Sequence, residues 1–426
     1  MILGCRGRSA GCGSRSPAIV VAAGADEEGR FVMNAFQAFV GKRIYACGAI
    51  VLALVLLMHP SGAWAGDQPR AMIGDQPFPS IQQAFDAAQD GDTVTILPGI
   101  WREGATVRAH NLTIEGTGAH LQDTAVGGKA ALVIQGDNTL VRGLEVSGVS
   151  VPSRNGAAIR QEGRNLTLQN VHFHSSEQGV LAGNNPGSTI IVEDSRFERL
   201  GRDGQAHGIY VNRIDALVIR GSHFLRSQDQ GHEIKSRATR TTIEYSVVAA
   251  LDGNDSRLID LPDGGVNVIR NNVLQQGPNS VNGQLIGVGL ELRGGSTWPD
   301  NNTLIERNII INDRRHGTNE LVRWRDVTDP EIIRNIIIGL PPAQVAPGNT
   351  VLSLGDSGRI SLANTLALLI TEAPGAYNYF IDVGDDGELA TLSRSVNPVP
   401  LPGALPLFVS ALAALAFVLR RRRGTA

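Results

Sequence analysis

Short runs of alternating apolar and polar residues recur through the middle of this chain at a nearly fixed distance. Each run contains an apolar anchor, and by subtraction the anchors lie 24, 27, 24 and 26 residues apart: Leu168, Val192, Ile219, Ile243 and Ile269. A second apolar residue follows each anchor five positions later: Phe173, Phe197, Phe224, Val248 and Leu274. A fixed period in the twenties indicates stacked units, each too small to bury its own apolar face.

The content of one repeat indicates which kind of stack forms. Alternation of apolar and polar residues predicts short strands, because side chains on a strand switch faces at every residue. Asn, Asp, Gly or Ser separates the two apolar clusters of most repeats, which predicts a bend between two strands. No stretch of helical period lies between the repeats, and this argues against leucine-rich and helical solenoids. We therefore predict an all-β fold, a right-handed parallel β-helix.

This repeat resembles the pectin-lyase-like β-helix superfamily between about Phe78 and Ile338. The resemblance rests on spacing and residue class, so it concerns the fold rather than the chemistry. A short N-terminal helix is expected to cover the open end of the solenoid, where core and strand edges would otherwise be exposed. Ser80 would begin this helix and Gly91 would end it. Its apolar face comprises Ile81, Ala84, Phe85 and Ala88. The first strand follows at 94–96.

The repeat loosens after Leu274. Ile305 and Ile333 continue the anchor series, but at gaps of 36 and 28 residues by subtraction. The extra length lies mostly in 281–302, a Gly- and Asn-rich insertion of the kind that gathers on the binding face of a solenoid. We predict a linker over 66–77, the β-helix over 78–340 and a C-terminal cap or spacer over 341–398. Residues 351–370 suit either a last coil or a covering helix.

The N-terminal region has the features of an export signal. Lys42 and Arg43 precede an apolar run over 50–57, and Ala63-Trp-Ala65 supplies a cleavage site. We expect translation to start at Met33 and cleavage to follow Ala65, which makes 1–65 dispensable; a membrane anchor is the alternative. The only cysteines lie before this site: Cys5, Cys12 and Cys47. The mature chain is therefore expected to be exported without a disulfide.

The C-terminal region, 399–426, begins with Val399-Pro-Leu-Pro402 and continues with an apolar run over 404–419 and four arginines from Arg420. It resembles a VPLPA-type exosortase sorting tail, with Gly403 in place of the final alanine. The resemblance implies a Gram-negative exporter, transient insertion into the inner membrane and tail removal by an exosortase. The protein would then reach the cell surface or extracellular matrix beside exopolysaccharide. A plain C-terminal anchor is the alternative.

The composition of the chain limits the classes of molecule that it is expected to bind. The net charge of −3 gives no electrostatic footprint for nucleic acid. With 50 glycines and 5% aromatic residues, the chain suits a thin stacked core. We expect a monomer whose partner is an acidic exopolysaccharide.

Stacking the repeats predicts a column of chemically active side chains on one sheet. The inward residues would be Val180, Ile209, Ile234 and Ile259. The neighbouring outward column then reads Leu181, Tyr210, Lys235 and Asp260, with strands roughly 4.8 Å apart. Asn212 and Arg237 would stand beside this column, and His207 and His232 would lie on its other flank.

Such a patch suits a uronic-acid polysaccharide. β-Elimination needs a cation on the uronate carboxylate, a base for the C5 proton and an acid for the leaving oxygen. In this hypothesis Lys235 is the base, Arg237 holds the carboxylate, and Tyr210 or His207 is the acid. The substrate-binding residues would be His232, Asn212, Asp260 and Glu233.

The Lys235-Ser236 step is similar to the lysine-bearing strand of chondroitinase-B and alginate-lyase-like β-helix enzymes. That resemblance implies a catalytic arginine on the following coil, where this chain has Asp260, with Arg257 nearby. The calcium-binding acidic set of those enzymes is not recognisable. Calcium is still an option, because Asp252-Gly-Asn-Asp255 suits either a calcium site or a turn.

A purely structural interpretation accounts for the same residues. Lys235 and Asp260 would form a cross-strand ion pair, and Arg237 and Glu233 would belong to a solvated face. The remaining repeat histidines would be surface spacers rather than a metal site: His172, His174 and His223. Three hypotheses remain: a uronate polysaccharide lyase or related enzyme, a non-catalytic β-helix that binds matrix polysaccharide, and a structural surface spacer.

Overall fold

The structure is a computed structural model that describes residues 68–291, 298–352, 379–383 and 389–394. The predicted signal peptide, its cleavage site and the predicted sorting tail lie outside these ranges. Across the ranges that are described, no helix is both long and apolar enough to cross a membrane.

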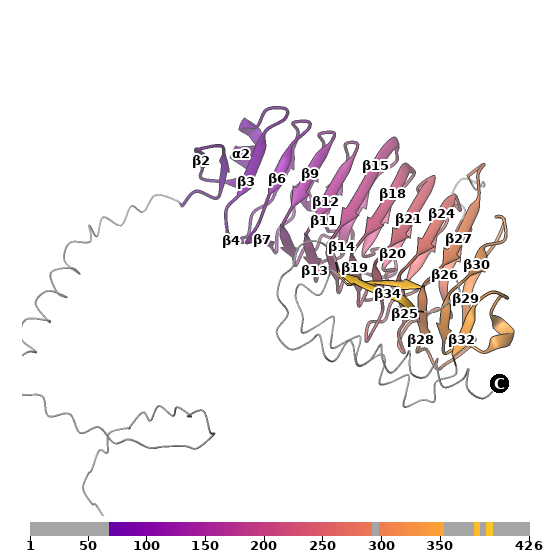
Figure 1. Ribbon diagram of the computed structural model, residues 1–426. Helices are drawn as coiled ribbons and strands as arrows, with labels where there is room; N and C mark the ends of the chain where they lie inside the picture. The colour runs from indigo at the N-terminus through magenta and orange to yellow at the C-terminus, as the bar shows by residue number, and fades with distance from the viewer. Residues whose placement is uncertain (1–67, 292–297, 353–378, 384–388, 395–426) are drawn as a thin grey trace, which may run out of the picture. The chain divides into compact units, whose positions relative to one another are not determined.

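Three sheets line the described solenoid, and successive coils add a strand to each (Figure 1). The 12-stranded sheet contains β1 (Ala71–Ile73), β2 (Gln76–Phe78), β3 (Thr93–Ile96), β6 (Thr113–Glu115), β9 (Thr139–Arg142), β12 (Leu166–Gln169), β15 (Asn185–Glu193), β18 (Ile214–Arg220), β21 (Arg240–Glu244), β24 (Val266–Arg270), β27 (Asn302–Glu306) and β30 (Glu331–Ile333). The 11-stranded sheet contains β4 (Gly99–Trp101), β7 (Ala119–Gln122), β10 (Glu145–Ser147), β13 (His172–His174), β16 (Arg196–Glu198), β19 (His223–Leu225), β22 (Val247–Ala249), β25 (Val273–Gln276), β28 (Ile309–Asn312), β31 (Ile336–Ile338) and β32 (Thr350–Leu352).

The 9-stranded sheet carries the candidate site. It contains β5 (Ala105–Val107), β8 (Ala130–Ile134), β11 (Ala157–Gln161), β14 (Gln178–Ala182), β17 (Ile209–Val211), β20 (Ile234–Ser236), β23 (Ile259–Leu261), β26 (Gln284–Val288) and β29 (Glu320–Trp324). The chain is thus a mostly-β parallel solenoid, and the fold-class prediction is confirmed.

The sequence repeat gives the register of the stack directly. The five anchors from Leu168 to Ile269 pair with one another in consecutive parallel strands. The residues five positions later also pair, from Phe173 to Leu274. All of these side chains are buried, and stacking them forms one continuous apolar core. One anchor was wrong: Ile305 pairs with Ile332, so Ile333 lies one position out of register.

The bend between the 12-stranded and 11-stranded sheets is held by a ladder of side chains. A residue with a left-handed φ precedes each ladder residue, as Asp194 (47°), Asn271 (55°) and Gly348 (85°) do. Each ladder side chain accepts a hydrogen bond from the backbone N–H of the preceding coil, at 2.9–3.1 Å. The ladder residues are Ser195, Ser222, Ser246, Asn272, Asn308, Asn335 and Asn349. This ladder satisfies backbone groups that the bend removes from the sheets.

The predicted capping helix is present as α2 (Ile81–Ala87). Ser80 is its N-cap and accepts a hydrogen bond from the Gln83 N–H at 3.1 Å. Ile81, Ala84 and Phe85 are buried, which confirms the apolar face. The helix ends at Ala87, before Gly91, because Ala88 already has an extended backbone.

The two ends of the solenoid extend beyond the predicted boundaries. β1 and β2 lie mostly within the stretch expected to be a linker and pair antiparallel at the edge of the 12-stranded sheet. β32 extends the 11-stranded sheet past residue 340. Of the stretch 351–370, only 351–352 lie within the described residues. A 3-10 helix, η1 (Pro342–Gln344), precedes β32. β33 (Tyr379–Val383) and β34 (Leu389–Arg394) form a separate antiparallel pair.

The ladder gives a stability prediction. Asn308→Ala removes the acceptor of the Asn272 N–H and the donor to the Ile269 carbonyl, both at 2.9 Å, from a fully buried position. Two buried backbone groups then lack partners, so we expect the free energy of unfolding to fall by about 2–4 kcal/mol. Urea denaturation measures this loss. Asn279→Ala, which loses one exposed hydrogen bond, is the control and should change little; equal losses for both variants would contradict the ladder.

Candidate functional site

The predicted outward column exists on the 9-stranded sheet. Leu181 pairs with Tyr210, Tyr210 with Lys235, and Lys235 with Asp260. The inward residues from Val180 to Ile259 pair in the same way and are fully buried. The sequence therefore placed the column correctly, but its two halves have different surroundings.

The C-terminal half of the column is a charge cluster in which Lys235 and Asp260 are buried, while Glu291 at its edge is exposed. Lys235 is 4% exposed, and its Nζ lies 2.7 Å from Asp260 Oδ2 and 2.8 Å from Glu291 Oε2. Arg257 Nη1 reaches Asp260 Oδ1 at 2.8 Å. Gly287 follows Asp260 in the column, and a Cβ there would lie 2.3 Å from Arg257 Nη1. The absence of a side chain at Gly287 thus leaves room for Arg257.

Opposing effects act on Asp260. Burial disfavours its charged form, but His232, Lys235 and Arg257 together outweigh burial and lower the pKa of Asp260 to about 2. Because His232 is itself neutral at pH 7, the two cations provide this stabilisation there. The cross-strand ion pair between Lys235 and Asp260 is thereby confirmed as a buried contact.

Arg237 is also buried and fully engaged. It is 2% exposed, donates to Tyr210 Oη at 3.1 Å and to the Glu291 carbonyl at 3.0 Å, and pairs with Asp263. Its Nη2 also lies 3.2 Å from Glu291 Oε2. Burial lowers the pKa of Arg237, but the contacts with Tyr210 and Asp263 outweigh burial and raise it above the ordinary value. The expectation of a solvated face at Arg237 is therefore wrong.

Described residues of the insertion after β26 lie over this cluster and do not form the wall of a groove beside it. Glu291 contacts Lys235 and Arg237, and Trp298 Nε1 donates to the Arg237 carbonyl at 3.2 Å. The Arg213 guanidinium lies 4.8 Å from the centre of the Trp298 ring. Segments on both sides of 292–297 thus pack over the residues that the sequence placed on an open face.

His207 and His232 are buried against each other. Their rings are stacked with centroids 4.8 Å apart, and the backbone N–H of His232 donates a hydrogen bond to His207 Nδ1 at 3.0 Å. Burial and the nearby cations lower the pKa of His207 well below its ordinary value. Burial also lowers the pKa of His232, to about 3, although Asp260 opposes this shift. Both rings are neutral at pH 7, and at 1% and 4% exposure neither reaches an external ligand.

Glu233 is not a surface residue. It is 1% exposed, and its two carboxylate oxygens accept hydrogen bonds from the Ser227 N–H at 2.6 Å and the Ser227 hydroxyl at 2.7 Å. Burial, with the nearby Asp255 carboxylate, raises the pKa of Glu233 well above its ordinary value. Glu233 therefore holds a loop, and the expectation of a solvated face at Glu233 is wrong.

The candidate calcium loop favours the turn interpretation. Asp252 pairs with Arg226 at 2.7 Å, whereas Asp255 is fully buried and accepts from the Ser280 hydroxyl at 2.5 Å. Burial raises the pKa of Asp255 to about 7. His232, Asp260 and Glu291 also approach one another closely, but Lys235 Nζ already bridges the two carboxylates. An incoming cation would have to displace that ammonium group.

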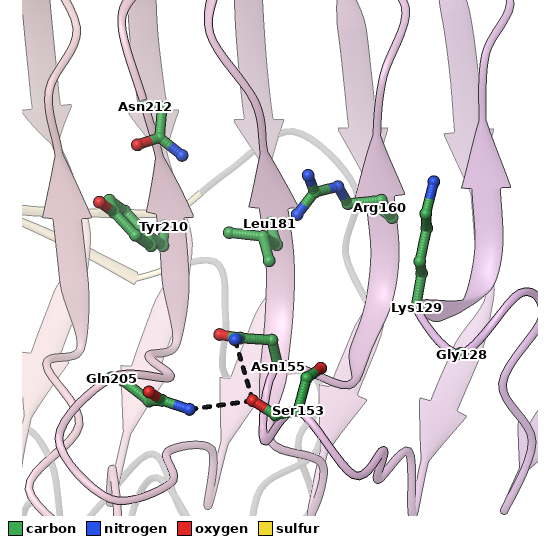
Figure 2. A pocket seen from close by; sticks show the side chains of 9 residues that line it. All are labelled: Gly128, Lys129, Ser153, Asn155, Arg160, Leu181, Gln205, Tyr210 and Asn212. Carbon is green, nitrogen blue, oxygen red and sulfur yellow. Dashed lines mark hydrogen bonds between the residues drawn. The ribbon is translucent and has the colours of Figure 1, made fainter.

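The N-terminal half of the column opens into a pocket of about 390 Å³ (Figure 2). It lies over β8, β11, β14 and β17, so four successive coils contribute to it. Tyr210 and Asn212 are the predicted site residues that line it. The other lining residues are Gly128, Lys129, Ser153, Asn155, Arg160, Leu181 and Gln205.

An apolar cluster lies on this outer face beneath the pocket. It consists of Ala130, Val133, Ala157, Leu181 and Tyr210. Leu181 and Tyr210 are 7% and 8% exposed, and both line the pocket. An aromatic ring beside aliphatic groups is suited to the C–H face of a sugar or to another apolar ligand surface.

Two cations border the pocket, and they differ in their partners. Lys129 Nζ binds Glu162 Oε1 at 2.5 Å. Arg160 lies 4.0 Å from the same carboxylate, and its buried Nε has no hydrogen-bond partner among the described residues. A buried donor without a partner is costly. Figure 2 shows the Arg160 guanidinium beside Leu181 at the pocket.

Loops before the strands supply amides at the rim. Glu177 organises one of them, because its carboxylate accepts from the Gly156 N–H at 2.7 Å and the Val151 N–H at 3.1 Å. Asn155 and Gln205 both donate to the Ser153 carbonyl, at 3.1 and 3.0 Å (Figure 2). Hydrogen bonds therefore connect the two loops of the rim and hold its amide groups in fixed positions.

Arg160 is a pocket residue that was not among the predicted site residues, although the sequence contains a signal for it. Arg160 pairs with Leu181, so it is the next member of the predicted column toward the N-terminus. The alternation in Ala158-Ile159-Arg160 would have placed it outward. On bends, alternation gives no information about the direction of a side chain, and this applies to Lys129, Asn155 and Gln205.

The buried histidines give a pH prediction. The folded-state pKa of His232 is about 3, below the ordinary value of 6.5, so its contribution to stability is complete above pH 6.5 and is lost as the pH falls toward 3. Burial lowers the pKa of His172 and His223 in the same direction. Asp255 and Glu233 act in the opposite direction, because their pKa values are raised, so the contribution of His232 is measured as a difference between variants. Between pH 7 and 4.5, the change in the free energy of unfolding from urea denaturation should be about 2 kcal/mol less unfavourable in His232→Gln than in the parent chain.

The control for this measurement is His316→Gln, because His316 is exposed. It should retain the pH slope of the parent chain. An equal pH slope for the parent chain and His232→Gln between pH 7 and 4.5 would contradict the burial argument.

A family model described as a right-handed β-helix region matches residues 99–273. The structure is similar to a PL6 alginate lyase solved in complex with a trisaccharide, at 19% identity and a TM-score of 0.38, over 63% of this chain and 59% of that one. It is also similar to the pectate lyase Pel9A, at 15% identity and a TM-score of 0.41, over 76% of this chain and 86% of that one.

The comparison with curated proteins gives no match. The chain spans 59% of the length of the alginate lyase that it resembles. These similarities concern the β-helix alone, and the chemistry has to be argued from the residues of this chain.

Proposed function

We propose that this protein is an exported β-helix protein that binds an acidic, uronate-containing exopolysaccharide at the cell surface or in the extracellular matrix. The binding site is the pocket over β8, β11, β14 and β17. The observation that carries the proposal is Arg160, whose buried Nε has no partner, next to the exposed edges of Leu181 and Tyr210. The predicted signal peptide and sorting tail supply the cellular context.

The chemistry of the pocket favours a carboxylated sugar over a neutral one. A guanidinium group binds a carboxylate through two parallel hydrogen bonds, and burial strengthens that contact. Lys129 adds positive charge at the rim, although Glu162 partly neutralises it. The amides of Asn155, Gln205 and Asn212 can bond to hydroxyl groups. Strands roughly 4.8 Å apart repeat these contacts along the solenoid, as an extended chain of sugars requires.

Binding rather than catalysis fits the rest of the column. Lys235, Arg237, His207 and His232 are buried and already paired. A base or acid in β-elimination must reach the sugar within hydrogen-bond distance. Of the four residues predicted to be catalytic, Tyr210 alone lines the pocket, and its hydroxyl accepts from Arg237.

The test is affinity for a panel of polysaccharides: alginate, polygalacturonate, hyaluronan and neutral dextran, with and without calcium. We expect binding to the carboxylated polymers, weaker binding at high salt, and no binding to dextran. Arg160→Ala should weaken binding at least 10-fold, because the carboxylate loses its two-pronged partner. Isothermal titration calorimetry with defined oligosaccharides measures the change.

Arg164→Ala is the matched control. Arg164 lies in the same coil, is exposed and does not line the pocket. It should leave the affinity unchanged. Equal affinities for the parent chain and Arg160→Ala, or equal binding of dextran and alginate, would rule out carboxylate recognition in this pocket.

A lyase is the second candidate, and one contact favours it. Glu291 Oε2 lies between Lys235 Nζ and Arg237 Nη2, at 2.8 and 3.2 Å. A uronate carboxylate would make the same contacts if Glu291 withdrew, and Tyr210 would then stand beside it as the acid. In this second candidate Glu291 occupies the position of the substrate carboxylate.

The lyase candidate is tested by absorbance of unsaturated uronate products. If the cluster is catalytic, Glu291→Gln should increase product formation several-fold, because the competing carboxylate is removed, and Lys235→Ala should abolish it. The binding proposal expects no product from any of these chains. A rise in the parent chain that disappears in Lys235→Ala would overturn the non-catalytic assignment.

A further inference from the structure

A cluster of histidines and one glutamate lies on a different face of the solenoid. His120, Glu145 and His174 belong to β7, β10 and β13, three successive strands of the 11-stranded sheet. Glu145 pairs directly with His120, and Ser147, two residues later on the same strand, pairs with His174. The register of the coils therefore brings together residues that are far apart in the sequence.

The distances within this cluster suit coordination of one ion. Glu145 Oε1 lies 3.0 Å from His174 Nε2 and 3.7 Å from His120 Nδ1. All three candidate ligand atoms lie within 4.8 Å of one another. Ligand atoms around tetrahedral zinc are roughly 3.4 Å apart, given bonds of about 2.0–2.1 Å. Small side-chain rotations would therefore complete the site.

A second observation supports coordination: the other nitrogen of each imidazole has a hydroxyl partner. His120 Nε2 lies 2.7 Å from the Ser147 hydroxyl, and His174 Nδ1 lies 3.2 Å from the Ser175 hydroxyl. When those nitrogens carry the protons, the lone pairs of His120 Nδ1 and His174 Nε2 are on the side of Glu145. Hydrogen bonds of this kind fix the tautomer and ring orientation of metal-binding histidines.

We propose that His120, Glu145 and His174 form a site for a divalent transition metal, with Zn²⁺ as the expected ion. Two imidazoles and one carboxylate favour Zn²⁺, Co²⁺, Ni²⁺ or Cu²⁺ over Ca²⁺ and Mg²⁺, which prefer oxygen ligands. The three side chains are 17%, 41% and 24% exposed, in chain order, so an ion can reach them from solvent. Three protein ligands leave a fourth position for water or a ligand group.

The bound ion would link three coils. Binding to the folded chain alone raises its stability in proportion to the logarithm of the free ion concentration. The site is independent of the polysaccharide pocket, because it lies on another sheet and shares no residue with it. Failure of one proposal therefore leaves the other intact.

The experiment uses the purified chain after tag removal and treatment with a chelator. Titration with Zn²⁺ should show one equivalent bound per chain, and a tenfold excess of Zn²⁺ should raise the melting temperature. Co²⁺ should give a visible absorption spectrum typical of a four- or five-coordinate ion. Ca²⁺ should have neither effect. His120→Ala and His174→Ala should each weaken Zn²⁺ binding at least 10-fold, and Glu145→Gln should weaken it as well.

His110→Ala is the control, because His110 is half-exposed and also lies near a carboxylate, 3.9 Å from Asp137. It should bind Zn²⁺ as the parent chain does. The urea midpoints of the metal-free variants show whether each has folded. Binding well below one equivalent, or equal binding by the double variant His120→Ala/His174→Ala, would mean an adventitious ion only and would overturn the proposal.

Discussion

The register between stacked coils is the constraint on which the rest of this structure depends. Parallel strand pairing fixes each coil against the next, and the ladder from Ser195 to Asn349 satisfies the backbone groups at the bend where pairing stops. A register slip of one residue would turn every outward side chain inward. Because the register holds, residues about 25 positions apart become neighbours roughly 4.8 Å apart. The pocket over β8, β11, β14 and β17 and the histidine cluster both arise in this way.

The fold and the column could be predicted because they depend on spacing and alternation alone. The pairing of Tyr210 with Lys235 and of Lys235 with Asp260 follows once Ile209, Ile234 and Ile259 are assigned to the core. The surroundings of that column could not be predicted, because the path of the insertion after β26 has no repeat to define it. Glu233 and His207 were misjudged for a related reason: they precede their strands, where loops rather than alternation decide burial.

The two halves of the column differ in how closely carboxylates neutralise their cations. Lys235 and Arg237 are buried, so each must be neutralised by a nearby carboxylate, and removal of one partner of a buried pair typically costs about 3–5 kcal/mol. Asp260, Asp263 and Glu291 provide that neutralisation. Arg160 is less buried, and its carboxylate neighbour lies 4.0 Å away. Arg160 thus lies outside the part of the column that Glu291 and Trp298 contact.

Tyr210 contacts the buried charge cluster in the C-terminal half of the column and also lines the pocket in the N-terminal half. Its ring belongs to the apolar floor of the pocket, while its hydroxyl accepts a hydrogen bond from Arg237 and its ring edge packs against His207. A tyrosine on an open sheet face would otherwise sample several rotamers, and ordering it on binding would weaken affinity. The contacts with Arg237 and His207 restrict the Tyr210 ring without any ligand. Arg237 and His207 thus help to shape the pocket, although neither lines it.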